Sequence, residues 1–221
     1  ASDVYKRQDE NEQLRRMEIG ALQEQINPHF LFNTLDSLRF TSMMNNVPVV
    51  SDGLAALSHL LRSSILKDNS YTPLHSELQT VEDYLTLQRI RCCETIVLKT
   101  EISEEAAKAS VMRLLLQPIV ENAILHGIDG MTGAVISVRA QTDGNQLKIT
   151  VRDNGRGFPA DMLGQPYRRD KGLAKGHLGL YNVDMILRGN FGERGGLWLS
   201  CGEDGGAVVT ALLPVRYDTE L

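Results

Sequence analysis

The sequence predicts a helical hairpin followed by an α/β two-layer sandwich. Up to about residue 65, apolar side chains recur at helical spacing, with an interruption at Val47 and Pro48. After residue 95, several short segments instead alternate apolar and polar side chains, as half-buried strands do. We therefore divide the chain into the hairpin, residues 9–72, and the sandwich, residues 73–221.

The hairpin is predicted to consist of two helices. The first extends from about Asp9 to Asn46 and contains Pro28, which lacks a backbone N–H, so we expect a bend just before His29. The second helix has one apolar stripe, formed by Val50, Leu54, Leu57, Leu61 and Ile65. Two helices of this length bury too little core alone, so we expect a second copy to complete a four-helix bundle.

His29 is predicted to face water. At about 100° per residue, Leu31, Leu35 and Leu38 lie roughly 200°, 240° and 180° around the helix from His29. The leucines would then face inward and the imidazole outward. The alternative is a core histidine beside a helix bend, and the outward direction weakens it.

The second part of the chain is predicted to hold helices on one face of a mixed sheet. The sequence "DGN" between two alternating segments is a hairpin signal. Helices are expected over residues 75–91, 112–127 and 178–187, and strands over residues 96–102, 134–142, 147–151, 196–200 and 207–213.

Composition excludes several classes of partner. The net charge of −5 argues against general binding to nucleic acid. No run of about eighteen apolar residues is present, so we expect no direct membrane contact from this part of the protein. The three cysteines have no metal-ligand spacing, which predicts reduced thiols and a cytoplasmic location.

The motif "QPIVENAILHG", residues 117–127, places Glu121, Asn122 and His126 near one edge of a helix. An amide oxygen, a carboxylate and an imidazole in that arrangement could hold a hydrated magnesium ion and a phosphate chain. The alternative for this motif alone is an ordinary polar helix face.

The motif "VRDNGRGFP", residues 151–159, places Asp153 at the end of a strand. Gly155 and Gly157 would let the backbone adopt positive φ and approach a flat ligand closely. A buried carboxylate there can accept a hydrogen bond from an exocyclic amine such as that of adenine. The alternative is a strand-ending turn.

The motif "KGHLGLYNV", residues 175–183, places Gly176 and Gly179 at the start of a helix. Free backbone N–H groups and the positive helix end suit a phosphate group. A glycine pair before a helix is weak alone, but the three motifs in this order are a stronger signal.

Together the three motifs resemble the nucleotide-binding domain of the GHKL (Bergerat) superfamily, which gyrase, MutL and histidine kinases share. The resemblance implies ATP and magnesium as cofactors, with Asn122 as the magnesium ligand. It assigns nucleotide binding to Asn122, His126, Asp153, Gly155, Gly157, Gly176, Gly179 and Leu180. It also implies a mobile lid in which Arg168, Arg169 and Lys171 face the phosphates, although a solvated charge run is an equal alternative there.

Two further stretches, "LQEQINPHFLFNTLDSL" and "PLHSELQTVEDYLTLQRIR", resemble the LytS/YesM-like class of sensor histidine kinases. The resemblance implies a homodimer that phosphorylates His29 with ATP and passes the phosphoryl group to an aspartate in a response-regulator receiver domain. It also implies that the chain is the cytoplasmic part of a longer membrane sensor.

The base for His29 is not evident, because Phe30 follows it where most histidine kinases have an acidic residue. We expect Glu121 to assist as the base and Asn33, about 40° from His29 on the helix, to orient a water for dephosphorylating the regulator. Two alternatives are a GHKL-type ATPase whose hairpin only dimerises and a scaffold that binds nucleotide poorly.

Overall fold

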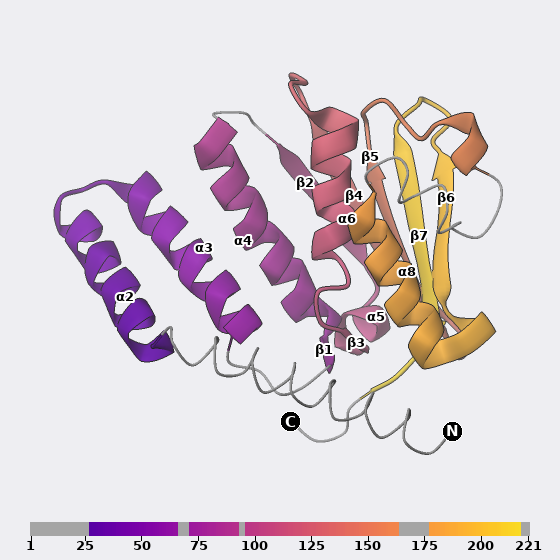
Figure 1. Ribbon diagram of the computed structural model, residues 1–221, viewed down its shortest axis with the longest axis horizontal. Coiled ribbons are helices and arrows are strands. Elements are labelled where there is room, and N and C mark those ends of the chain that lie inside the picture. Colours follow the sequence, from indigo (N-terminus) through magenta and orange to yellow (C-terminus); the bar gives the residue numbers. More distant parts are fainter. Residues whose placement is uncertain (1–26, 66–70, 93–95, 164–176, 218–221) are drawn as a thin grey trace, which may run out of the picture. The chain divides into compact units, whose positions relative to one another are not determined.

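The computed structural model describes residues 27–65, 71–92, 96–163 and 177–217 (Figure 1). The chain forms two compact units, residues 1–58 and residues 59–221. Lys171 and Gly176, the lid arginines Arg168 and Arg169, and the helix predicted before Asn27 lie outside the described residues.

Helix α2 (Pro28–Met44) starts where the sequence predicted a bend. Asn27 is its N-cap, with φ −64° and ψ 102°, and its side-chain oxygen accepts the N–H of Phe30 at 3.2 Å. Pro28 occupies the first turn, where a missing N–H removes no helical hydrogen bond. The prediction of a bend inside a continuous helix is therefore wrong: Asn27 leaves the helical backbone, and α2 begins there.

The bulky apolar side chains of the hairpin are only partly buried within one chain. Leu35 is buried as predicted, whereas Leu38 is 52% exposed within the single chain. In α3 (Pro48–Ile65), Val50 and Ile65 are exposed, and the buried residues are the small Ser51, Gly53, Ala56 and Ser58. Two helices alone offer too little core to cover the larger side chains.

The second unit contains the predicted mixed sheet, with strand order β2-β4-β5-β7-β6. Strands β2 and β4 are parallel and the other pairs are antiparallel. The strands are β2 (Val97–Ile102), β4 (Val135–Asp143), β5 (Gln146–Asp153), β6 (Gly196–Cys201) and β7 (Ala207–Pro214). Each lies within one or two residues of its predicted bounds.

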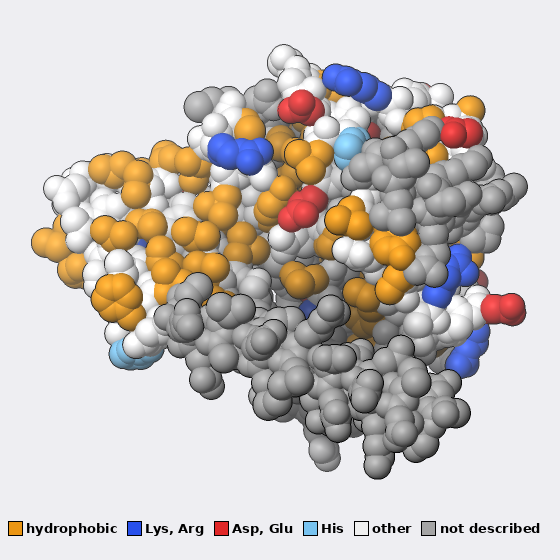
Figure 2. All heavy atoms as spheres, in the orientation of Figure 1, with side chains coloured by type: hydrophobic (Ala, Val, Ile, Leu, Met, Phe, Trp, Pro, Cys, Tyr) orange, Lys and Arg blue, Asp and Glu red, His pale blue; other side chains and the backbone are white. Residues whose placement is uncertain are grey.

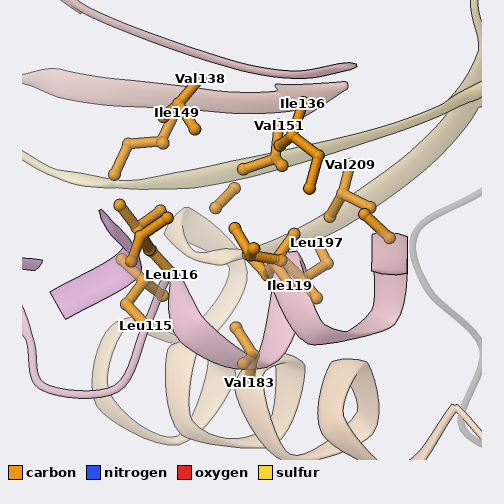
Figure 3. Packing of buried hydrophobic residues seen from close by; sticks show 14 of the residues in the cluster. Leu115, Leu116, Ile119, Ile136, Val138, Ile149, Val151, Val183, Leu197 and Val209 are labelled. Carbon is orange, nitrogen blue, oxygen red and sulfur yellow. The ribbon is translucent and has the colours of Figure 1, made fainter. Parts of the chain in front are cut away.

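Helices α4 (Leu74–Cys92), α6 (Gln117–Asn122) and α8 (Leu178–Phe191) lie on one side of this sheet (Figure 1). Figure 3 shows the core between the layers: Ile149 and Val151 of β5 point toward Ile119 of α6 and Val183 of α8. Burying one such side chain contributes about 1.5–3 kcal/mol. This core therefore fixes β5, and with it the residue at its end, against the helices.

The helix predicted over residues 112–127 is shorter and less regular than expected. Its first residue, Met112, belongs to β3 (Ser110–Met112), which pairs with β1 (Tyr71–Pro73), and Leu114 adopts φ 57°. After α6 the chain continues as a π-helical turn, η1 (Ala123–Ile128). Three other short elements were not predicted: α5 (Glu104–Lys108) and the 3₁₀ turns η2 (Ala160–Met162) and η3 (Gly192–Arg194).

Glu77 of α4 holds the turn before α6. Its carboxylate accepts the backbone N–H groups of Leu114, Leu115 and Leu116 at 3.0, 3.0 and 3.2 Å. Glu77 is buried, and burial raises the pKa of its carboxyl while these hydrogen bonds oppose the rise. The buried carboxylate thus satisfies N–H groups that a helix start leaves without partners.

Among the helices that the structure describes, none has the length and apolar character needed to cross a membrane.

Candidate functional site

A cavity of about 270 Å³ lies where β5 ends, beside η1 and the start of α8. Four separate segments of the chain line it. The described lining residues are Asn122, His126, Gly127, Asp153, Arg156, Gly157, Phe158, Pro159, His177 and Ala207. The cavity therefore unites residues from all three polar motifs of the second unit.

Asp153 is the last residue of β5 and is buried, with 3% of its surface exposed. Its Oδ1 accepts the N–H groups of Gly155 and Ala207 at 2.8 and 3.1 Å. Burial raises the pKa of the Asp153 carboxyl, and the two backbone hydrogen bonds oppose the rise. Within the described residues no hydrogen bond reaches Oδ2, so this oxygen can accept from a ligand.

The two glycines after Asp153 serve different purposes. Gly157 has φ 74°, as predicted. Gly155 does not have positive φ, so that part of the prediction is wrong; instead, a Cβ there would lie 2.1 Å from the carbonyl oxygen of Gly127. A Cβ on Gly127 would in turn lie 2.9 Å from Cγ of Asp153. The absence of side chains lets these backbones pack directly beside the carboxylate.

Asn122 and His126 both line the cavity, as the sequence predicted, although the helix changes to π geometry between them. Asn122 is buried, and its Oδ1 lies 2.5 Å from Nδ1 of His177. The His177 ring lies 4.4 Å from the His126 ring and 5.9 Å from the Phe158 ring, measured between centroids. His177 thus connects the first motif with the third.

Among the lining residues with titratable or charged side chains, the sequence reasoning missed two, His177 and Arg156. Both stand inside quoted motifs, His177 directly after Gly176 and Arg156 between Gly155 and Gly157. Arg156 is exposed and places a cationic side chain at the cavity. Their positions directly beside motif glycines could have identified both as residues of the site.

Four predicted site residues of the second unit do not line the cavity: Glu121, Gly155, Gly179 and Leu180. The carboxylate of Glu121 accepts a hydrogen bond from Nε2 of Gln117 at 2.8 Å. Gly179 lies in the first turn of α8, where a Cβ would be 3.3 Å from Cβ of Pro118, so its small size permits α6 and α8 to pack closely. Leu180 is fully buried in the core.

In the first unit, His29 is exposed, as predicted. Nδ2 of Asn33 lies 3.3 Å from Nδ1 and 3.2 Å from Nε2 of the imidazole. The Asn33 amide therefore contacts the exposed imidazole from one turn further along the same helix.

The cavity fits a nucleotide with magnesium. An acceptor oxygen on Asp153, backbones without side chains at Gly127 and Gly157, and the cation of Arg156 suit a base and its phosphates. Among the described side chains, no group of three or more His, Cys, Asp or Glu could hold a metal ion. A magnesium ion would therefore take most of its ligands from phosphate and water, as it commonly does.

Comparison with known families agrees with this geometry. Residues 107–217 match the family of histidine kinase-, DNA gyrase B- and HSP90-like ATPases, and the chain belongs to it. Residues 17–96 match the histidine kinase family. The resemblance to the LytS/YesM-like class of sensor histidine kinases is therefore confirmed.

Relatives with known names are sensor histidine kinases. The chain is 31% identical over 206 residues to "Sensor histidine kinase YesM" of Bacillus subtilis, covering 93% of this chain and 34% of that protein. It is 34% identical over 188 residues to "Sensor histidine kinase YpdA" of Escherichia coli, covering 82% of this chain and 33% of that protein. The chain thus spans about a third of the length of these relatives.

The fold also matches a solved structure. The nucleotide-free catalytic domain of histidine kinase ThkA superposes with a TM-score of 0.51 at 19% identity, covering 69% of this chain and 100% of that domain. The predicted α/β sandwich of GHKL type is therefore confirmed.

Proposed function

We propose that this chain is the kinase region of a sensor histidine kinase in two-component signalling. It phosphorylates His29 with ATP and passes the phosphoryl group to an aspartate in a response-regulator receiver domain. The observation that carries the proposal is the exposed imidazole of His29, inside the segment that matches histidine kinases. Residues 9–72 would dimerise and accept the phosphoryl group, and residues 73–221 would bind ATP.

The cavity residues have distinct roles in this proposal. Oδ2 of Asp153 accepts from the adenine amine, and Asn122 offers an amide oxygen to magnesium. His126 lies against the base and Gly157 leaves its part of the cavity wall free of a side chain, while Gly155 supports the site by packing against the Gly127 backbone. Bound ATP and magnesium supply the phosphoryl group and neutralise part of its charge. From outside the described residues, Lys171 would contact the phosphates and Gly176, with Gly179 and Leu180, would complete the second glycine motif.

We propose Glu121 as the base that assists His29, and Asn33 as the residue that orients a water for dephosphorylating the regulator. Asn33 already contacts the imidazole. An unchanged autophosphorylation rate in Glu121→Gln would exclude the first role. Normal phosphatase activity in Asn33→Ala would exclude the second.

A homodimer is supported by the surface of the hairpin. Figure 2 shows hydrophobic side chains gathered over α2 and α3. Phe40, Met43, Met44 and Val49 are all more than half exposed. Soluble monomers rarely expose large contiguous apolar patches, so a second copy that covers these side chains completes the predicted four-helix bundle.

The lengths of the relatives support a longer parent protein. Because it spans about a third of named sensor kinases, we propose that it is the cytoplasmic region of a membrane-associated sensor. The sensed signal would act on the remainder of that protein.

The proposal is tested by incubating the chain with γ-labelled ATP and magnesium and measuring acid-labile, alkali-stable label on the protein. His29→Gln should lose the label and still bind nucleotide, whereas Asp153→Asn should lose both. His75→Gln removes another exposed histidine, on α4, and should keep the label. Released phosphate without labelled protein would instead support the alternative, an ATPase whose hairpin only dimerises.

A further inference from the structure

The imidazole of His177 lies inside the cavity proposed for the nucleotide. It lines that cavity together with Asp153, only 6% of the residue is exposed, and its Nδ1 lies 2.5 Å from Oδ1 of Asn122. One side of the ring contacts the His126 ring, at 4.4 Å between centroids, and its edge approaches Phe158 at 5.9 Å. Three separate contacts therefore hold this side chain in place.

These contacts occupy the groups that a nucleotide needs. A carboxamide oxygen only accepts hydrogen bonds, so Nδ1 of His177 carries the proton and donates to Asn122. The same oxygen is the atom that asparagine offers to a cation, because the amide nitrogen has no free lone pair. His126, the other predicted nucleotide contact on this helix, faces the same imidazole ring.

His177 is the N-cap residue of α8, but its side chain makes no capping hydrogen bond to that helix. The ring instead contacts Asn122 and His126 and lines the cavity. A side chain of the chain itself therefore fills part of the site.

We propose that His177 is an internal competitor of the nucleotide. Its imidazole occupies Asn122 and His126 and must leave before ATP and magnesium can bind. The proposal rests on the proposed function, namely that this cavity binds ATP. The apparent association constant for ATP then equals the intrinsic constant multiplied by the fraction of molecules in which His177 has left the cavity. The smaller that fraction is, the weaker the apparent binding.

The alternative role for His177 predicts the opposite change in nucleotide affinity when the side chain is removed. A residue that contacted the bound nucleotide, or that oriented Asn122 toward magnesium, would contribute to affinity, and its removal would weaken binding. A competitor lowers affinity, and its removal must tighten binding.

Isothermal titration calorimetry distinguishes the two roles by the direction in which the affinity changes. The 221-residue chain is titrated with magnesium and adenylyl imidodiphosphate, a non-hydrolysable ATP analogue. We expect His177→Ala to bind roughly tenfold more tightly than the parent chain, since one hydrogen bond and one ring contact no longer compete. His177→Gln keeps an amide donor for Asn122 but no ring, and should fall between the two. His75→Ala, which removes an imidazole that contacts Ala107 and does not line this cavity, should bind like the parent chain.

A measurement on the unaltered chain covers the case in which His177→Ala does not fold. In the ring-proton NMR spectrum, contacts between His177 and His126 should disappear when the analogue saturates the site. Persistence of these contacts, or equal or weaker binding by folded His177→Ala, would overturn the proposal. If the parent chain binds and Asp153→Asn does not, such a result would leave the proposed function intact. If no variant binds, both proposals fail.

Discussion

Replacing Asp153 by asparagine should weaken nucleotide binding and stabilise the fold at the same time. Two backbone N–H groups, of Gly155 and Ala207, donate to Oδ1. In the variant only the amide oxygen can accept them, so the amide NH₂ must take the place of Oδ2. An adenine amine would then meet a donor instead of an acceptor.

The loss of affinity follows from that one hydrogen bond. A hydrogen bond to a charged group contributes about 1.5–3 kcal/mol, which corresponds to roughly 10- to 150-fold in the dissociation constant. The two backbone hydrogen bonds keep an acceptor in the variant, so the surrounding loop should keep its conformation. The loss should therefore appear in binding and not in folding.

The gain in stability follows from the pKa of Asp153. Burial raises it in the folded state, so the folded protein binds the proton more tightly than the unfolded chain. As pH rises above the ordinary carboxyl pKa, ionisation then costs folding free energy, and an amide avoids this cost. The unfolding free energy of Asp153→Asn should exceed that of the parent chain at pH 7, and the excess should shrink as pH falls toward 4.

Titration calorimetry with the ATP analogue and urea unfolding at pH 7 and pH 4.5 measure the two effects. Asp143→Asn, which removes an exposed carboxylate at the end of β4, is the matched control and should change neither quantity. Unchanged affinity in Asp153→Asn would refute the role of Oδ2. A stability loss that grows toward neutral pH would refute the argument from burial.

Three other substitutions test the fold around the sites. Glu77→Ala leaves three N–H groups without their acceptor and should lower the unfolding free energy by about 3–5 kcal/mol in urea melts; a loss below 1 kcal/mol would contradict this assignment. Gly155→Ala would push a Cβ against the Gly127 carbonyl and should reduce both thermal stability and nucleotide affinity. The control Gly189→Ala, on the open surface of α8, should stabilise the protein by about 0.5–1 kcal/mol. Similar melting temperatures for the two variants would count against close packing at Gly155. Asn27→Ala removes the α2 cap and should cost about 1 kcal/mol by circular dichroism melting, and an unchanged melt would mean that the cap is dispensable.

The sheet was predictable from the sequence because one face of it is buried. Strand β5 alternates Leu147, Ile149 and Val151, all buried, with more exposed polar residues, and period two has no other structural meaning over that length. The same reasoning placed Asp153 on the inward face at the strand end. In β5 the local alternation agrees with the tertiary structure, so the predicted strand is confirmed.

The region before α6 was mispredicted because its structure depends on a distant residue. A run of leucines after Met112 fits helical spacing, but Leu114 adopts φ 57°. The carboxylate that accepts the N–H of Leu114 comes from Glu77, 37 residues earlier in the chain. Nothing in the local sequence signals that contact. Pro28 shows a similar limit, since a proline pattern alone does not distinguish a bend from a first turn.

The residues of the candidate site likewise include some that the sequence predicted and others, such as His177, that it did not. Asp153, Asn122 and His126 were found because each motif carries its chemistry in residue types at short spacing. His177 was missed because its contact with Asn122 joins residues 55 positions apart. Asp153 and Asn122 nevertheless share one property, since each is buried and lines the cavity. Oδ2 of Asp153 accepts no hydrogen bond from the described residues, whereas Oδ1 of Asn122 already contacts His177. If both oxygens bind the nucleotide complex as proposed, only the contact at Asn122 must be broken first, so only that contact lowers the affinity.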